Sequence, residues 1–167
     1  MKVISGGQTG VDRAALDAAL SCGLTCGGWC PKGRRAEDGV IDVRYPLIEA
    51  PSAGYRQRTE WNVRDSDGTL ILHRGDVLRG GTALTRDLAL RRGKPCLVVN
   101  LEPSPTHDKT LSWLSRHTIN TLNVAGPRES QQPGIYHQSL ACLQRLFNTL
   151  QEIASGQPDR HKSPPDR

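Results

Sequence analysis

The sequence is poor in aromatic residues and has no long apolar run. Phenylalanine, tyrosine and tryptophan make up 4% of its 167 residues. Proteins that hold single-stranded nucleic acid stack bases on aromatic side chains beside a basic groove, so this composition disfavours a nucleic-acid partner. No apolar stretch approaches the roughly 20 residues that span a bilayer, and no signal-peptide-like segment follows Met1. We therefore expect a cytoplasmic protein with no membrane partner.

Cysteine and histidine are also few, and their spacing is not that of a metal site. Three of the five cysteines, Cys22, Cys26 and Cys30, recur every four residues, unlike the C-x₂-C pairs that bind zinc. An odd cysteine count in a cytoplasmic chain argues against a disulfide framework. The five histidines are scattered, and only His73, just beyond a predicted strand, could face a site. We expect cysteines that pack as small apolar residues, and no metal site.

The charge of the chain is moderate and spread out. A net charge of +5 results from 22 basic and 17 acidic residues, with small basic clusters at 32–35, 56–58 and 91–94. An anionic small-molecule ligand, together with ordinary solvated faces, accounts for this excess.

Strand-like and helix-like segments alternate along the chain. We expect strands at 2–5, 25–29, 68–72, 95–100 and 119–124, and helices at 12–22, 56–64, 83–92, 106–117 and from 133 or 134 to about 154. The segment 95–100 has the clearest pattern of a central strand, 40–48 is expected to be extended, and the charged loop 31–39 to contain no element. Alternation of this kind predicts an α/β fold, a Rossmann-like three-layer sandwich with a mostly parallel sheet. We expect one ligand-binding domain over 1–154 and a disordered polar tail over 155–167.

Three loops that follow predicted strands have the composition of anion-binding loops. Ligands of open α/β sheets bind beyond the carboxyl ends of the strands, and helix N-termini bind phosphates through free N–H groups. Glycines at these turns let the backbone approach a ligand closely. The predicted ligand- and phosphate-binding residues are Gly6, Gly7, Gln8, Thr9, Gly10, Gly80, Gly81, Thr82, Gly126, Arg128, Glu129 and Ser130.

The residues that could support catalysis form a less complete set than those that could bind a ligand. Arg128 could clamp an anionic oxygen, with Glu129 orienting it or contacting a ribose or base; a local surface ion pair between the two is the simpler alternative. Asp12 could serve the start of the first helix or reach a ligand. Glu129 and Asp12 are the candidate catalytic carboxylates, and no Ser-His-Asp arrangement or histidine metal pair accompanies them.

Several motifs together resemble a known family. SGGQTGVDRAALD (5–17), GWCPKG (28–33), EDG (37–39), NV (62–63), SDGTLI (66–71), GGT (80–82), KP (94–95) and LNVAGPRES (122–130) are similar to those of the bacterial molybdenum-carrier family. The resemblance covers nearly all of the chain up to about residue 150. It implies a Rossmann-like fold related to the lonely-guy (LOG) phosphoribohydrolases and binding of a molybdenum-cofactor cargo without metal ligation by side chains.

The same resemblance bears on catalysis. LOG enzymes carry the signature P-G-G-x-G-T-x-x-E, and its glutamate acts on a glycosidic bond. Thr85 stands at the corresponding position here, and a threonine without an activating partner is no general base near neutral pH. We therefore expect a protein that binds a phosphorylated nucleotide or a pterin-type ligand such as molybdenum cofactor. The alternative is a nucleotide N-glycosidase that uses Glu129 or Asp12. The resemblance and the exposed helices also lead us to expect a homo-oligomer.

Overall fold

A computed structural model describes residues 1–156, and its centre is a five-stranded parallel sheet. The strands are β1 (Lys2–Ile4), β2 (Thr25–Gly27), β7 (Gly68–His73), β8 (Cys96–Asn100) and β9 (Thr121–Ala125), in the order β2-β1-β9-β7-β8. Every pairing in this sheet is parallel. The predicted α/β, Rossmann-like sandwich with a parallel sheet is confirmed.

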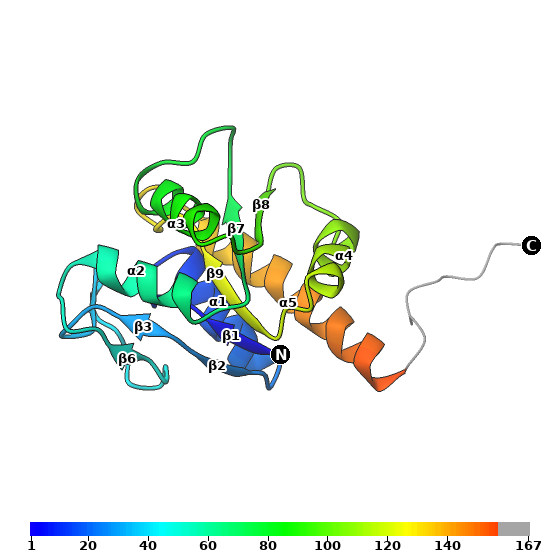
Figure 1. The fold of residues 1–167 in the computed structure, drawn as a ribbon, viewed down its shortest axis with the longest axis horizontal. Helices are drawn as coiled ribbons and strands as arrows, with labels where there is room; N and C mark the ends of the chain where they lie inside the picture. The colour runs from blue at the N-terminus through cyan, green and yellow to red at the C-terminus, as the bar shows by residue number, and fades with distance from the viewer. Residues whose placement is uncertain (157–167) are drawn as a thin grey trace, which may run out of the picture.

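Helices cover both faces of the sheet (Figure 1). The helices α1 (Val11–Ser21) and α5 (Ile135–Ser155) pack against each other, and α2 (Tyr55–Arg64) packs against α3 (Gly80–Arg91). The fifth helix, α4 (Asp108–Arg116), connects β8 to β9. A large apolar cluster joins α1 and α5 to the strands, and a smaller one joins α2 to α3. The sheet thus lies between two helical layers.

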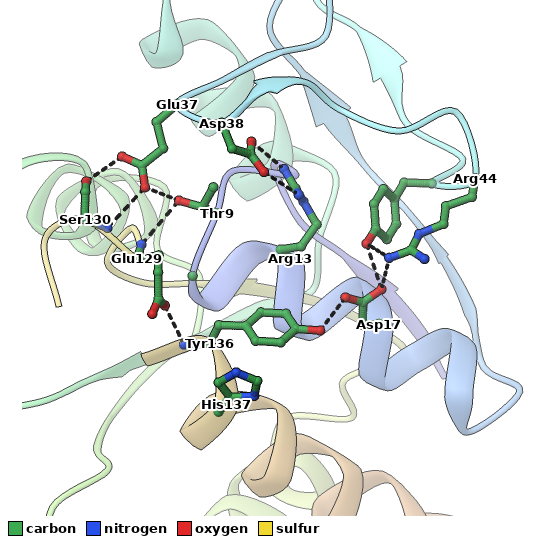
Figure 2. A pocket seen from close by; sticks show the side chains of 12 residues that line it. Thr9, Arg13, Asp17, Glu37, Asp38, Arg44, Glu129, Ser130, Tyr136 and His137 are labelled. Atoms are coloured by element: carbon green, nitrogen blue, oxygen red, sulfur yellow. Dashed lines mark hydrogen bonds and ion pairs between the residues drawn. The ribbon is translucent and has the colours of Figure 1, made fainter. Parts of the chain in front are cut away.

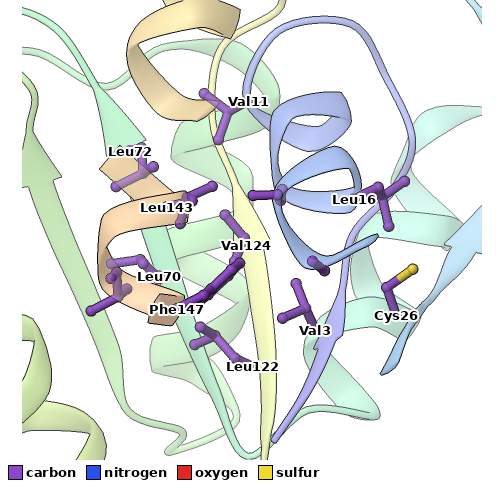
Figure 3. Packing of buried hydrophobic residues seen from close by; sticks show 14 of the residues in the cluster. Val3, Val11, Leu16, Cys26, Leu70, Leu72, Leu122, Val124, Leu143 and Phe147 are labelled. Carbon is purple, nitrogen blue, oxygen red and sulfur yellow. The ribbon is translucent and has the colours of Figure 1, made fainter. Parts of the chain in front are cut away.

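The larger cluster forms the core under α1 and α5 (Figure 3). Val11 from α1 and Phe147 from α5 are fully buried, and they share the cluster with Val124 and Leu122 of β9. The predicted apolar faces of these two helices therefore meet the sheet as their spacing indicates.

Four short strands lie outside the main sheet. β3 (Trp29–Cys30) pairs in parallel with β6 (Ile48–Glu49), and β4 (Arg35–Ala36) forms a small hairpin with β5 (Gly39–Val40). The expectation that 31–39 contains no element is therefore wrong, as is that of one extended segment over 40–48. The second error arises because the chain turns between β5 and β6 around the guanidinium of Arg34, a contact that local sequence does not reveal.

Two further expectations need correction. The segment predicted as a central strand, β8, is at the edge of the sheet, and β7 and β9 lie inside it. A continuous apolar run reports burial but not strand order. Helix α3 begins at Gly80 instead of residue 83, so the glycines form its first turn. The tail was predicted over 155–167, and its residues 157–167 lie outside the described residues.

Candidate functional site

The loops that follow β1 and β9 contact each other at the carboxyl edge of the sheet. The N–H of Val11 donates to the carbonyl oxygen of Pro127 at 3.2 Å, and the N–H of Glu129 donates to Thr9 Oγ1 at 3.2 Å. A Cβ atom on Gly10 would lie 2.3 Å from the Pro127 oxygen. Only glycine allows this approach, so Gly10 serves the contact between the loops.

A crevice opens between the neighbouring strands β9 and β7, because β9 leads to α5 and β7 to α3 on the other side of the sheet. An inner cavity of about 80 Å³ and an outer cavity of about 560 Å³ share Thr82 and Gln131 in their walls. Residues from all three predicted loops line the inner cavity: Gln8, Gly81, Thr82, Gly126 and Arg128. This is the place that the topology of an open α/β sheet assigns to a ligand.

Several helices begin near this edge, and in α1 and α5 the protein itself binds N–H groups of the first turn. The first N–H of α1 is bonded to Pro127, and the carboxylate of Glu129 accepts hydrogen bonds from the N–H groups of Gly134 and Tyr136 at the start of α5. Among the described residues, the N–H groups of Gly80 and Gly81 at the start of α3 have no partner. The N-terminus of α3 therefore offers N–H groups to an anion.

The glycines of the first loop face protein atoms. A Cβ on Gly6 would lie 1.4 Å from Arg58 Nη1, and one on Gly7 would lie 2.5 Å from Leu47. A Cβ on Gly126 would lie 2.3 Å from the Leu72 carbonyl oxygen. Our expectation that Gly6 and Gly7 leave room for a phosphate does not match this geometry.

Gly81 differs from these glycines. A Cβ there would meet no atom within 4 Å, and its backbone φ is not in the left-handed region. The glycine that leaves open space beside its Cα is therefore Gly81, on α3.

Arg58 is a site residue that sequence reasoning missed. It comes from α2, and its Nη1 lies 2.8 Å from the carboxylate of Asp12, with both side chains largely buried. The inner cavity also includes Arg56 and Arg128, so three arginines and one carboxylate line it. The basic cluster at 56–58, on the helix predicted to precede the strand at 68–72, was the available signal.

Two buried donors beside this cavity have no hydrogen-bond partner among residues 1–156. They are Gln8 Nε2 and Arg58 Nε, and Gln8 is 4% exposed. Buried polar groups without partners are rare in folded proteins, and one explanation is a ligand that the site is built to hold.

The guanidinium of Arg128 lies over the ring of Tyr55, 4.7 Å from its centre. No carboxylate of residues 1–156 is within ion-pair distance of Arg128. The predicted alternative of an Arg128–Glu129 ion pair is therefore wrong, because Glu129 is engaged by the backbone of α5.

Four of the remaining predicted residues line a separate cavity of about 590 Å³, the α1–α5 cavity (Figure 2), and Gly6, Gly7 and Gly80 line none of the three cavities. Thr9, Gly10, Glu129 and Ser130 form one wall of it. The opposite wall centres on Asp17, whose carboxylate accepts hydrogen bonds from Arg44 and from the hydroxyl groups of two tyrosines, Tyr45 and Tyr136.

Burial, followed by the hydrogen bond to Asp17, raises the pKa of Tyr136 to about 12. The same two causes raise the pKa of Tyr45, against the opposing effect of Arg44. Neither hydroxyl is therefore ionised near neutral pH.

The remaining candidates have structural surroundings. All five cysteines are free thiols; Cys26, Cys30 and Cys142 are buried, and Cys22 and Cys96 are partly buried. His73 is buried in the wall of the outer cavity. Among residues 1–156, no three histidine, cysteine or acidic side chains are grouped to hold a metal ion. Over the same residues, no helix has the length and apolar character to cross a membrane.

Comparisons with known proteins identify the family of this chain. The model of the circularly permutated YpsA SLOG family matches residues 3–147. The chain belongs to this family. The crystal structure of a proposed molybdenum carrier protein from Syntrophus aciditrophicus SB is 49% identical in sequence, with a TM-score of 0.82 over 87% of this chain and 93% of that chain. The comparison with curated proteins gave no match. The family resemblance drawn from the motifs is confirmed.

In this SLOG-family member, the candidate catalytic groups are already engaged. Asp12 pairs with Arg58, and Glu129 binds the first N–H groups of α5. The Thr85 hydroxyl donates to the carbonyl oxygen of Gly81 at 2.8 Å. None of these groups is arranged as a free general base.

Proposed function

We propose that this SLOG-family protein binds a phosphorylated small molecule, a nucleotide or a pterin-type cofactor, in the crevice between β7 and β9. The observation that carries the proposal is the inner cavity. There the free N–H groups of α3 lie near three arginines, and the unpartnered donors Gln8 Nε2 and Arg58 Nε are buried beside them. A phosphate would receive hydrogen bonds from these donors and would gain from the helix dipole.

The size of the two cavities suggests how such a ligand would lie. The inner cavity, at about 80 Å³, is much the smaller of the two, and we assign the phosphate to it. The outer cavity of about 560 Å³ would take a ring system, beside His73 and Gln132.

We further propose that the physiological ligand is molybdenum cofactor and that the protein is its carrier. The similar protein from Syntrophus aciditrophicus is named as a molybdenum carrier. The donors of the crevice fit the phosphate of such a cargo. The cargo would then be held through its organic part, and the molybdenum would need no side-chain ligands.

Isothermal titration calorimetry with AMP, GMP, CMP, UMP and their nucleosides tests the phosphate site. We expect at least one monophosphate to bind, and its nucleoside to bind at least about tenfold more weakly, because hydrogen bonds to a charged group contribute about 1.5–3 kcal/mol. Equal affinities for a nucleoside and its monophosphate would contradict the site.

Arg128→Ala should weaken monophosphate binding about tenfold and lower the melting temperature by less than about 2 °C, since Arg128 is in no ion pair within residues 1–156. Arg91→Ala, on the exposed end of α3, is the matched control. Equal losses of affinity in both variants would indicate that general charge, and not this site, attracts the ligand.

The alternative of an N-glycosidase has no support from the geometry of its candidate carboxylates. Chromatography of the same monophosphates after prolonged incubation distinguishes the two functions. We expect no free base, and its release would contradict a purely binding role.

A further inference from the structure

Glu37 lies on an exposed turn between β4 and β5, yet its carboxylate connects three segments of the chain (Figure 2). It accepts hydrogen bonds from the Thr9 hydroxyl, from the Ser130 N–H at 3.1 Å and from the Ser130 hydroxyl at 2.5 Å. Thr9 belongs to the loop after β1 and Ser130 to the loop after β9. The turn is therefore fixed against both loops of the carboxyl edge.

The backbone of the same turn determines how Gln8 is oriented. The Glu37 N–H donates to Gln8 Oε1 at 2.9 Å, and the Thr9 N–H donates to the same oxygen at 3.0 Å. Two N–H donors can bind only the oxygen end of an amide. The nitrogen end must then point away from the turn, and it is this Nε2 atom that is buried without a partner while Gln8 lines the inner cavity.

We propose that Glu37 is a positioning residue for the anion of the crevice and that it acts through Gln8; this rests on the proposed phosphate site. The carboxylate holds the turn in place, the turn holds Gln8 Oε1, and Gln8 Nε2 is thereby presented as a donor to the phosphate. Glu37 itself lines the α1–α5 cavity and is absent from the wall of the inner cavity. Glu37 therefore does not contact the anion, and its effect passes through Gln8 across the loops that follow β1 and β9.

A double-mutant cycle tests this role. We expect Gln8→Met and Glu37→Ala each to weaken binding of inorganic phosphate and AMP about fivefold to tenfold. The double variant should bind no more weakly than Gln8→Met alone, because interacting residues are not additive. Glu37→Gln, which keeps one acceptor oxygen, should recover part of the affinity, and Glu152→Ala, an exposed carboxylate near the end of α5, should change nothing. Additive losses would overturn the proposal.

A measurement without ligand separates this proposal from the proposed function. The side-chain amide signals of Gln8, identified by their loss in Gln8→Met, should be distinct from those of exposed glutamines in the NMR spectrum of the free protein. In Glu37→Ala they should move to the positions of exposed glutamines. Unchanged signals would overturn the role of Glu37 even if wild-type protein binds AMP. If the signals move but the wild-type protein binds neither phosphate nor AMP, the phosphate site itself is wrong, and the role of Glu37 with it.

Discussion

At the scale of single residues, glycines of similar sequence context have different functions. Gly6 and Gly81 both lie in glycine pairs next to a helix, and both patterns predict a phosphate loop. In the structure, the space beside Gly6 holds the Arg58 guanidinium, whereas the space beside Gly81 is open. The difference depends on a residue 52 positions away, so the sequence around either glycine does not contain it.

This difference predicts opposite results for the two alanine variants. In Gly6→Ala the new Cβ would displace Arg58 from Asp12, and we expect a loss of about 3 kcal/mol in unfolding free energy, as for a broken buried ion pair. In Gly81→Ala the helix loses a flexible residue, and we expect a gain of up to about 1 kcal/mol together with weaker AMP binding. Urea unfolding and calorimetry of both variants provide the measurements. A Gly81→Ala protein that is destabilised would contradict the open space assigned to this position.

At the scale of elements, one side chain, that of Arg34, makes hydrogen bonds along the segment between β5 and β6. The guanidinium of Arg34 donates to the carbonyl oxygens of Ile41, Asp42, Tyr45 and Leu47 at 2.8–3.1 Å. Arg34 itself has a φ of 51°, which is uncommon for a residue with a side chain. Our sequence interpretation of 31–39 as a charged loop without an element missed this role, because a basic residue in a polar segment normally faces solvent.

We expect Arg34→Lys to lower the free energy of unfolding by about 2 kcal/mol. A lysine keeps the charge, but its compact ammonium cannot reach four separate carbonyl groups as a planar guanidinium does. Arg35→Lys, at the exposed neighbouring position, is the matched control and should stay within about 0.5 kcal/mol of wild type. Urea unfolding at neutral pH measures both. Equal stability of the two variants would show that the loop does not depend on this guanidinium.

At the scale of the whole molecule, the sequence predicted the layers better than the contacts between them. The periodicity of α1 and α5 and the apolar character of β7 indicated which faces are buried, and the parallel sheet followed from the alternation of elements. Local pattern gave neither the edge position of β8 nor the pairing of Arg58 with Asp12, because both depend on residues far apart in the chain. The expected homo-oligomer stays a prediction.

Asp17 of α1 accepts hydrogen bonds from α5 and from the segment before β6, and this makes stability depend on pH. Tyr136 must keep its proton to donate to Asp17, and its pKa is raised from 10.0 to about 12 in the folded protein. A raised pKa contributes stability that is complete below the unfolded value and is lost as pH rises through the folded value. The contribution of Tyr136 should therefore be constant up to about pH 10 and should decline toward pH 12.

Comparison of wild type with Tyr136→Phe isolates this contribution, because Tyr45, the other tyrosine on Asp17, is present in both proteins. We expect the variant to be less stable by about 1 kcal/mol at pH 8, the usual value for one hydrogen bond. The difference should shrink as pH rises from 10 to 11.5, since Tyr136 of the unfolded wild-type chain ionises in this range while the folded protein keeps the proton. Urea unfolding at pH 8, 10, 11 and 11.5 measures the difference, with Tyr55→Phe as control, because the Tyr55 hydroxyl has no hydrogen bond within residues 1–156. A difference that stays constant across this range would mean that the hydroxyl contributes through packing alone. The hydrogen bond from Tyr136 to Asp17 would then contribute nothing to stability.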